Sequence, residues 1–154
     1  MTPAIVSYSE RSATSDQIRV HLEHCDQSYQ PPLSQRVHIG DYATKIAGNA
    51  ETFEAWVDGH LVGLVATYFS VDSGSGFVTS VSVDNDFTGH GIATALLTRC
   101  IERARSLRMG SIALEVFCGN DQAIRLYRKH GFVEYSTESD SMQMHLSLCG
   151  QENQ

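Results

Sequence analysis

The chain has 154 residues, of which 42% are hydrophobic and 19% are charged. This is the composition of one globular domain over residues 1–154, and it excludes a disordered or fibrous chain. The 18 acidic and 11 basic residues give a net charge of −7, which argues against binding to nucleic acid, because that needs a basic face. A local anion site made of uncharged backbone N–H groups remains compatible with this charge.

The start of the chain lacks a basic stretch followed by an apolar run, so we expect no secretory signal peptide. No segment approaches the ~18 consecutive apolar residues of a membrane helix, so no membrane association is expected. The four cysteines lie far apart and form no Cys-x-x-Cys pair; they are Cys25, Cys100, Cys118 and Cys149. We therefore predict reduced thiols, no metal site and a cytoplasmic protein.

The first fifty residues predict one short strand and two helices. An apolar run at 4–8 is typical of a strand, and Ser15-Asp16-Gln17 can begin a helix. The face of that helix is marked by apolar residues three or four apart, namely Ile18, Leu22, Cys25 and Tyr29. Pro31-Pro32 would end it. His21 and His24 on this helix indicate a solvent-exposed face rather than a metal site.

A short second helix is predicted over 41–47, with Gly48-Asn49 as its stop. Strands are then predicted at 53–57 and 61–69. Asp58-Gly59 between them is a strong hairpin signal, because both central residues of a type I′ turn need a positive φ.

A flexible loop at 72–76 leads into 77–83, whose alternating apolar and polar residues predict a half-buried strand. The next apolar stripe predicts a long helix from Ile92 to Leu107, followed by Gly110. The remaining chain predicts a strand at 112–117, a helix at 121–130 and strands at 133–136 and 142–148. Helices and strands mixed in this way indicate one α/β domain.

The turn before the long helix carries the first chemical signal. Residues 83–94 read as strand, glycine-bearing turn and helix start, and two glycines allow the backbone to approach a ligand closely. The first N–H groups of a helix have no partner within it and can bind phosphate oxygens. An ordinary strand–helix connection explains a lone Gly-x-Gly equally well. The segment completes neither a Rossmann fingerprint nor a P-loop.

A second segment, from Leu114 to Phe132, follows about thirty residues later. Alone, Asn120 is typical of a helix N-cap and Tyr127 of a core tyrosine. The two segments in this order are far more specific than either one.

Together they resemble the GCN5-related N-acetyltransferase (GNAT) family. That family's signature, (Gln/Arg)-x-x-Gly-x-(Gly/Ala), falls on Thr88-Gly89-His90-Gly91-Ile92-Ala93, with Thr88 in place of Gln or Arg. A later family pattern is matched at every spacing by Asn120, Ala123, Leu126, Tyr127, Lys129, Gly131 and Phe132. The resemblance is good over 53–132. The first fifty residues resemble the family only in their pattern of helices. The resemblance implies a mostly antiparallel, twisted sheet with helices on both faces.

The resemblance also implies acetyl-coenzyme A as cosubstrate. Its pyrophosphate would bind at the turn, and its pantetheine arm would enter where Val81-Ser82-Val83 diverges from 115–117. The implied cofactor-binding residues are Val81, Ser82, Val83, Thr88, Gly89, His90, Gly91, Ile92, Ala93, Thr94, Asn120 and Tyr127. Backbone amides would polarise the thioester carbonyl, and Tyr127 would protonate the leaving sulfur.

An amine near pKa 10 must lose a proton before it attacks. Glu115, twelve residues before Tyr127, is the first candidate base, because this spacing is similar to a branch of the family that acetylates a ribosomal protein's N-terminus. A polar residue on a strand face is the alternative interpretation. Asp84 and His38 are weaker candidates for the base.

The expected function is acetyl transfer to the primary amine of a small molecule, such as an amine or amino sugar. The alternatives are peptide N-terminal acetylation and a non-catalytic acyl-coenzyme A sensor. The net charge disfavours a toxin that acts on charged transfer RNA, and family precedent suggests a homodimer.

Overall fold

The computed structural model describes residues 5–29 and 31–148. In chain order the helices and strands are β1 Ser7–Glu10, α1 Ser15–Cys25, α2 Ile39–Asn49, β2 Glu51–Val57, β3 His60–Ser70, β4 Ser75–Val83, α3 Ile92–Ser106, β5 Ser111–Phe117, α4 Asp121–Lys129, β6 Val133–Glu138 and β7 Ser141–Ser147. Short 3₁₀ turns lie at Asp26–Ser28, Leu33–Gln35 and Asn85–Phe87. Among the described helices, none is long and apolar enough to cross a membrane.

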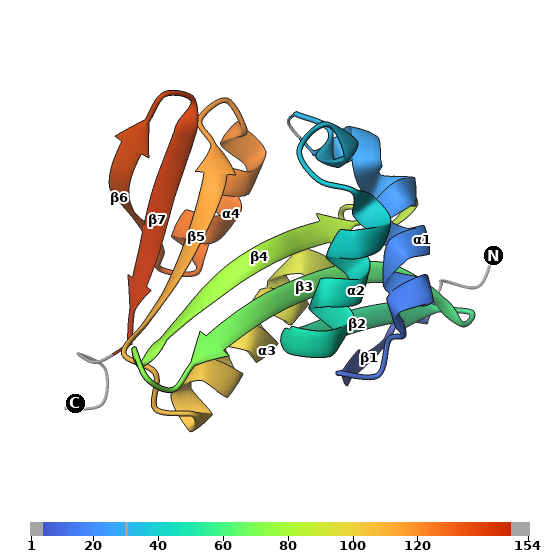
Figure 1. The fold of residues 1–154 in the computed structure, drawn as a ribbon, viewed down its shortest axis with the longest axis horizontal. Helices are drawn as coiled ribbons and strands as arrows, with labels where there is room; N and C mark the ends of the chain where they lie inside the picture. Colours follow the sequence, from blue (N-terminus) through green and yellow to red (C-terminus); the bar gives the residue numbers. More distant parts are fainter. Residues whose placement is uncertain (1–4, 30, 149–154) are drawn as a thin grey trace.

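Within the described residues the strands form one seven-stranded sheet in the order β1-β2-β3-β4-β5-β7-β6. Every neighbouring pair is antiparallel except β4 and β5, which are parallel. The β4–β5 ladder runs only from Ser75–Ser111 to Val78–Leu114, and beyond it the two strands diverge (Figure 1). The expected mostly antiparallel sheet and the expected splay are both confirmed.

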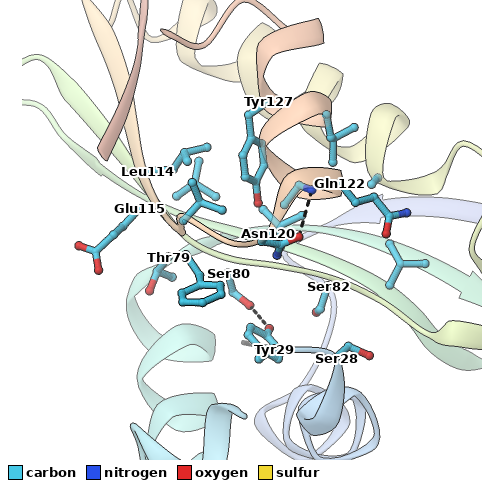
Figure 2. A pocket seen from close by; sticks show the side chains of 18 of the residues that line it. Ser28, Tyr29, Thr79, Ser80, Ser82, Leu114, Glu115, Asn120, Gln122 and Tyr127 are labelled. Carbon is cyan, nitrogen blue, oxygen red and sulfur yellow. Dashed lines mark hydrogen bonds between the residues drawn. The ribbon is translucent and has the colours of Figure 1, made fainter. Parts of the chain in front are cut away.

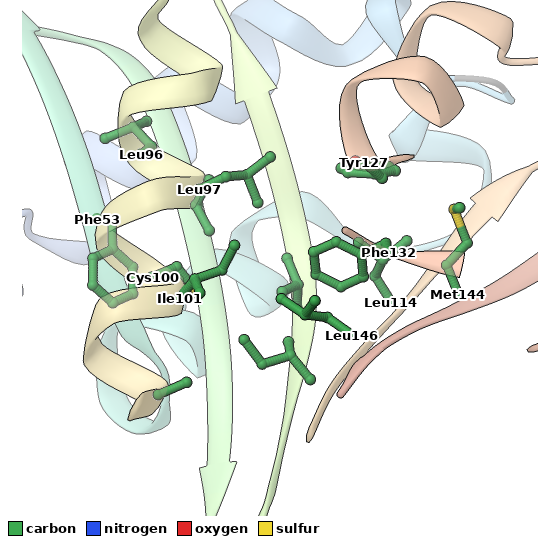
Figure 3. Close-up of a cluster of buried hydrophobic side chains, with 14 of the residues drawn as sticks. Phe53, Leu96, Leu97, Cys100, Ile101, Leu114, Tyr127, Phe132, Met144 and Leu146 are labelled. Carbon is green, nitrogen blue, oxygen red and sulfur yellow. The ribbon is translucent and has the colours of Figure 1, made fainter. Parts of the chain in front are cut away.

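Helices cover both faces of this sheet, as expected. On one face α1 and α2 bury a cluster that includes Ile18, Leu22 and Leu64. On the other face α3 and α4 pack over a larger cluster that includes Leu96 and Tyr127 (Figure 3). Full burial of each large apolar side chain contributes about 1.5–3 kcal/mol.

Local sequence signals explain where two of these elements begin or turn. At the start of α1, the Thr14 hydroxyl accepts from Gln17 N, and the Gln17 side chain accepts from Thr14 N. Such a capping box satisfies two N–H groups that a helix end leaves open. Asp58 and Gly59 have φ values of 50° and 79°, which confirms the predicted hairpin turn.

The predicted ends of the first two helices are wrong. The α1 helix stops at Cys25, and Tyr29 is extended (φ −77°, ψ 146°), so it does not continue the helix. The α2 helix begins earlier, at Ile39, because the His38 ring accepts a hydrogen bond from Asp41 N. It also runs through Gly48 to Asn49.

The predicted loop at 72–76 is shorter than expected, since β4 already begins at Ser75. The first strand is β1 at Ser7–Glu10 rather than 4–8, and residue 4 lies outside the described residues. The last strand ends at Ser147, and Cys149 also lies outside the described part of the chain.

Candidate active site

A cavity of about 1210 Å³ opens where β4 and β5 diverge. Its walls come from these two strands, the start of α3, α4 and the segment between α1 and α2. The cavity collects Glu115 and all but one of the predicted cofactor-binding residues; those that line it are Val81, Ser82, Val83, Thr88, Gly89, Gly91, Ile92, Ala93, Thr94, Glu115, Asn120 and Tyr127.

The exception is His90, which is exposed and does not line the cavity. Its ring packs edge-on against Phe87, with 6.2 Å between the ring centroids. Its part in binding the cosubstrate therefore stays a prediction.

The start of α3 is open to an anion. Gly91 is the N-cap residue in the left-handed region (φ 74°), and no side chain caps the helix. Gly89 is also left-handed (φ 84°), and a Cβ built on either glycine meets no atom within 4 Å. The first intrahelical bond is Ala95 N to Gly91 O, so the N–H groups of the three residues between them have no partner in the helix.

The diverging strands leave backbone groups of β4 without a β5 partner. Pairing stops at Val78, so residues 79–83 turn their β5-facing N–H and C=O groups toward the cavity. A polar, extended ligand inserted there would take the place of a strand, because backbone groups in a sheet need partners.

Tyr127 of α4 is 7% exposed and belongs to the buried cluster beneath α3. Figure 2 shows its hydroxyl pointing toward Asn120 and the cavity. Burial, with a smaller effect of the nearby Tyr29, raises the pKa of Tyr127. The hydroxyl is therefore protonated at neutral pH and can donate a hydrogen bond.

Asn120 lies beside Tyr127 as the N-cap of α4. Its Oδ1 accepts a hydrogen bond from Ala123 N at 3.2 Å. The cap uses the amide oxygen, so the amide nitrogen is the group that Asn120 can offer to a ligand in the cavity.

A row of hydroxyl groups forms the opposite wall and was not predicted. The Tyr29 hydroxyl lies 2.8 Å from Ser80 Oγ (Figure 2), and the Tyr42 hydroxyl donates to Thr79 O at 2.7 Å. Burial raises the pKa of Tyr29 to about 12, which the Ser80 and Ser82 hydroxyls offset only in part. This wall is therefore neutral and polar.

The alternation at 77–83 predicted a half-buried strand, and two serines of that strand are in fact buried. They are 3% (Ser80) and 7% (Ser82) exposed, because α1 and the segment after it cover that face. A strand alternation alone cannot show whether the polar face meets water or another element.

His21 is a further residue whose environment was predicted wrongly. It is 3% exposed, with Nδ1 at 3.0 Å from Leu61 O and Nε2 at 2.8 Å from Ser82 Oγ. Burial lowers the pKa of His21 to about 4, despite a raising effect from the Leu61 carbonyl and from Asp84. The sheet packs closely against this turn of α1, so the ring is not on a solvated face.

Glu115 is exposed on β5 and accepts from Gln143 Nε2 at 3.3 Å. Its strand neighbours Leu114 and Val116 are buried on the α3 side, so Glu115 lies on the other face. Figure 2 shows its carboxylate pointing away from Tyr127.

The two weaker base candidates, His38 and Asp84, do not line this cavity. His38 caps α2, and Asp84 pairs with His24 at 3.2 Å. Each therefore has a structural role away from the place where the strands diverge.

Three basic side chains of α4 line the same cavity; they are Arg125, Arg128 and Lys129. The total charge of −7 gave no indication of this local excess. The signal was available, because three basic residues within five positions of one helix must lie close together.

Comparison with known proteins identifies the family. The model of the acetyltransferase (GNAT) family matches residues 16–132, and the chain belongs to that family. An uncharacterized N-acetyltransferase of Bacillus subtilis, YdgE, is 34% identical over 73 residues, which are 47% of this chain and 43% of that protein. The match thus spans less than half the length of this curated relative.

Two solved structures show the same fold. The ribosomal-protein-S18-alanine N-acetyltransferase of Escherichia coli has a TM-score of 0.75 at 21% identity, over 93% of this chain and 94% of that one. The PaiA N-acetyltransferase of Thermoplasma acidophilum, solved in complex with coenzyme A, has a TM-score of 0.72 at 14% identity, over 92% and 99% of the two chains.

Proposed function

We propose that this protein transfers an acetyl group from acetyl-coenzyme A to the primary amine of a small molecule. The observation that carries the proposal is a single cavity that joins the diverging strands, the open start of α3 and the Tyr127 hydroxyl.

The residues fit acetyl-coenzyme A in shape and charge. The gap between β4 and β5 suits an extended arm with amide groups, and the open N–H groups at the start of α3 suit a pyrophosphate. Arg125, Arg128 and Lys129 add positive charge nearby. A protein solved with coenzyme A shares the fold. When bound, acetyl-coenzyme A supplies an acetyl thioester activated for attack by an amine.

The chain's own groups would assist that attack in three ways. Backbone N–H groups of 79–83 would donate to the thioester carbonyl oxygen, where negative charge develops. Tyr127 would donate its proton, or a hydrogen bond, to the departing sulfur. As the C–N bond forms and the C–S bond breaks, the amine proton would leave toward Glu115. Water would carry it, because the Glu115 carboxylate lines the cavity but points away from Tyr127, beside which the sulfur would leave.

A peptide N-terminus is the second candidate acceptor. It is favoured by the spacing of Glu115 and Tyr127 and by the fold shared with an enzyme named for ribosomal protein S18. The small-molecule acceptor ranks first because the segment before Phe53 does not follow the peptide-acetylating pattern. A non-catalytic sensor of acyl-coenzyme A would need neither Glu115 nor Tyr127.

The test is release of coenzyme A thiol with glucosamine, spermidine and an alanine-initiated hexapeptide, with mass spectrometry of each amine. We expect an acetylated small amine. Acetylation of the hexapeptide alone would establish the second candidate. Tight binding of acetyl-coenzyme A without any acetylated product would establish the sensor.

A further inference from the structure

The contact between His21 and Ser82 links α1 to the cavity and has no part in the mechanism above. Ser82 lies two residues along β4 from Ser80, the partner of Tyr29 (Figure 2). The ring and the serine are both buried, yet Ser82 still lines the cavity.

The positions of the protons in this contact follow from its geometry. A carbonyl oxygen can only accept, so Nδ1 of His21, at 3.0 Å from Leu61 O, carries a hydrogen. In the neutral ring Nε2 then has only a lone pair. The hydroxyl of Ser82, at 2.8 Å, must therefore donate to Nε2.

This arrangement determines whether the Ser82 hydroxyl can donate or accept a hydrogen bond with a molecule in the cavity. A serine hydroxyl has one hydrogen and two lone pairs. Because the hydrogen is used on His21, only lone pairs remain for a molecule in the cavity. An N–H donor would be bound there, and a group that can only accept would be rejected.

The charged groups near the ring do not change this result. Asp84 favours and His24 opposes protonation of His21, but burial outweighs both and keeps the ring neutral at ordinary pH. The ring is thus suited to hold the Ser82 hydroxyl in one orientation, and it is poorly suited to store a proton.

We propose that Ser82 accepts a hydrogen bond from the amine of the acceptor substrate, and that His21 is a positioning residue that orients the Ser82 hydroxyl for this contact. The inference rests on the proposed acetyl transfer to a primary amine and adds the residue that recognises the amine. The nearby Tyr29 hydroxyl, which lies within reach of Ser80, closes the same polar wall.

The direct test is ¹⁵N NMR of histidine-labelled protein saturated with coenzyme A. Comparison with His21→Gln assigns the His21 signals among the seven histidines. We expect the Nδ1–H tautomer, and a shift of the Nε2 resonance when n-butylammonium is added. The shift should be absent with n-butyrate and absent for n-butylammonium in Ser82→Ala. An Nε2–H tautomer, or no shift with n-butylammonium in the wild-type protein, overturns the proposal.

Kinetics with the best amine from the panel give a second readout. Loss of one hydrogen bond predicts that Ser82→Ala raises the KM for the amine about tenfold. The Kd for coenzyme A should stay the same, because the proposed contact of residue 82 with the cosubstrate is through its backbone, which the substitution keeps. His21→Leu should act like Ser82→Ala. His21→Gln should recover most of the loss, because one amide can donate to Leu61 O and accept from Ser82.

Ser106→Ala, which removes an exposed hydroxyl at the far end of α3, is the matched control. An unchanged amine KM in Ser82→Ala, or an equal loss of affinity for coenzyme A, contradicts the proposal. A His21→Gln variant that is as impaired as His21→Leu would also contradict the proposal. Calorimetry with coenzyme A tests the proposed function separately, since failure to bind it would refute acetyl transfer whatever the tautomer of His21.

Discussion

At the scale of single residues, the Tyr127 hydroxyl is the group that we propose as the proton donor to the leaving thiolate. Its raised pKa keeps it protonated over the neutral range. Tyr127→Phe should lower kcat about 10²–10⁴-fold, the range for one acid–base group, with little change in the KM for the amine. Initial rates of thiol release measure this effect. A loss smaller than about threefold would mean that the thiolate leaves without help from this residue.

Glu115 is the second residue whose role the pH dependence of the rate can decide. If its carboxylate receives the amine proton through water, Glu115→Gln should lower the rate and move the acidic limb of the pH–rate profile. Gln143→Ala is the control, because it removes only the 3.3 Å contact to the carboxylate. An unchanged acidic limb in Glu115→Gln would exclude Glu115 as the base.

Burial of His21 has a consequence for stability. Its pKa is about 4 in the folded protein and 6.5 ordinarily. As pH falls from 6.5 toward 4, the unfolded chain therefore binds a proton that the folded protein does not. The contribution of His21 to the free energy of unfolding should then fall by about 1.4 kcal/mol per pH unit.

Urea denaturation of the wild-type protein and of His21→Gln, at several pH values between 7 and 4.5, measures this contribution. The difference between the two proteins should follow the predicted slope. A difference independent of pH would show that the ring titrates normally in the folded protein.

Residues of the site were predictable where one local segment carries the signal. Asn120 and Tyr127 belong to one helix and its cap, and the turn at 88–91 carries its glycines in sequence. Tyr29 reaches Ser80, and His21 reaches Ser82, only because α1 and the segment after it pack on the sheet, so their roles depend on contacts between distant segments. Their spacing along the chain showed only a helix face and a strand face.

At the scale of elements, the start of α3 depends on backbone conformation at Gly91. A side chain in the left-handed region costs about 1–2 kcal/mol, so Gly91→Ala should lower stability by that amount. It should also weaken coenzyme A binding, because the helix would no longer begin with its N–H groups open. Thermal unfolding and calorimetry measure the two effects.

Gly48→Ala in α2 is the matched control. Gly48 is helical, and a Cβ there meets nothing within 4 Å. Alanine should therefore stabilise the protein by about 0.5–1 kcal/mol. If both variants had the same stability as the wild-type protein, a strained turn at Gly91 would be contradicted.

The order and type of the elements were predictable, and several of their ends were not. Gly48 was interpreted as a helix stop, but a glycine ends a helix only where the chain adopts a positive φ, which Gly48 does not. The 3₁₀ turn at Asp26–Ser28 is held by bonds from Ser34 to the Asp26 carboxylate at 2.7 Å. Such a contact between segments leaves no periodic pattern in the sequence.

At the scale of the whole molecule, the chain has a net charge of −7, whereas the side chains of α4 that line the cavity include three positive charges. The basic side chains of α4 gather at the cavity, while the acidic excess lies elsewhere on the chain. A phosphate-bearing cosubstrate can then bind to a protein that is acidic overall, because local potential and open N–H groups decide binding at short range. Total charge alone could not predict this arrangement.

Backbone N–H groups of β4 and of the start of α3 are proposed to hold acetyl-coenzyme A. Amide hydrogen exchange with and without acetyl-coenzyme A tests this proposal most directly. We predict slower exchange at residues 79–83 and 92–94, with little change in α2 and β1. Binding that leaves these amides as exchangeable as before would contradict the claim.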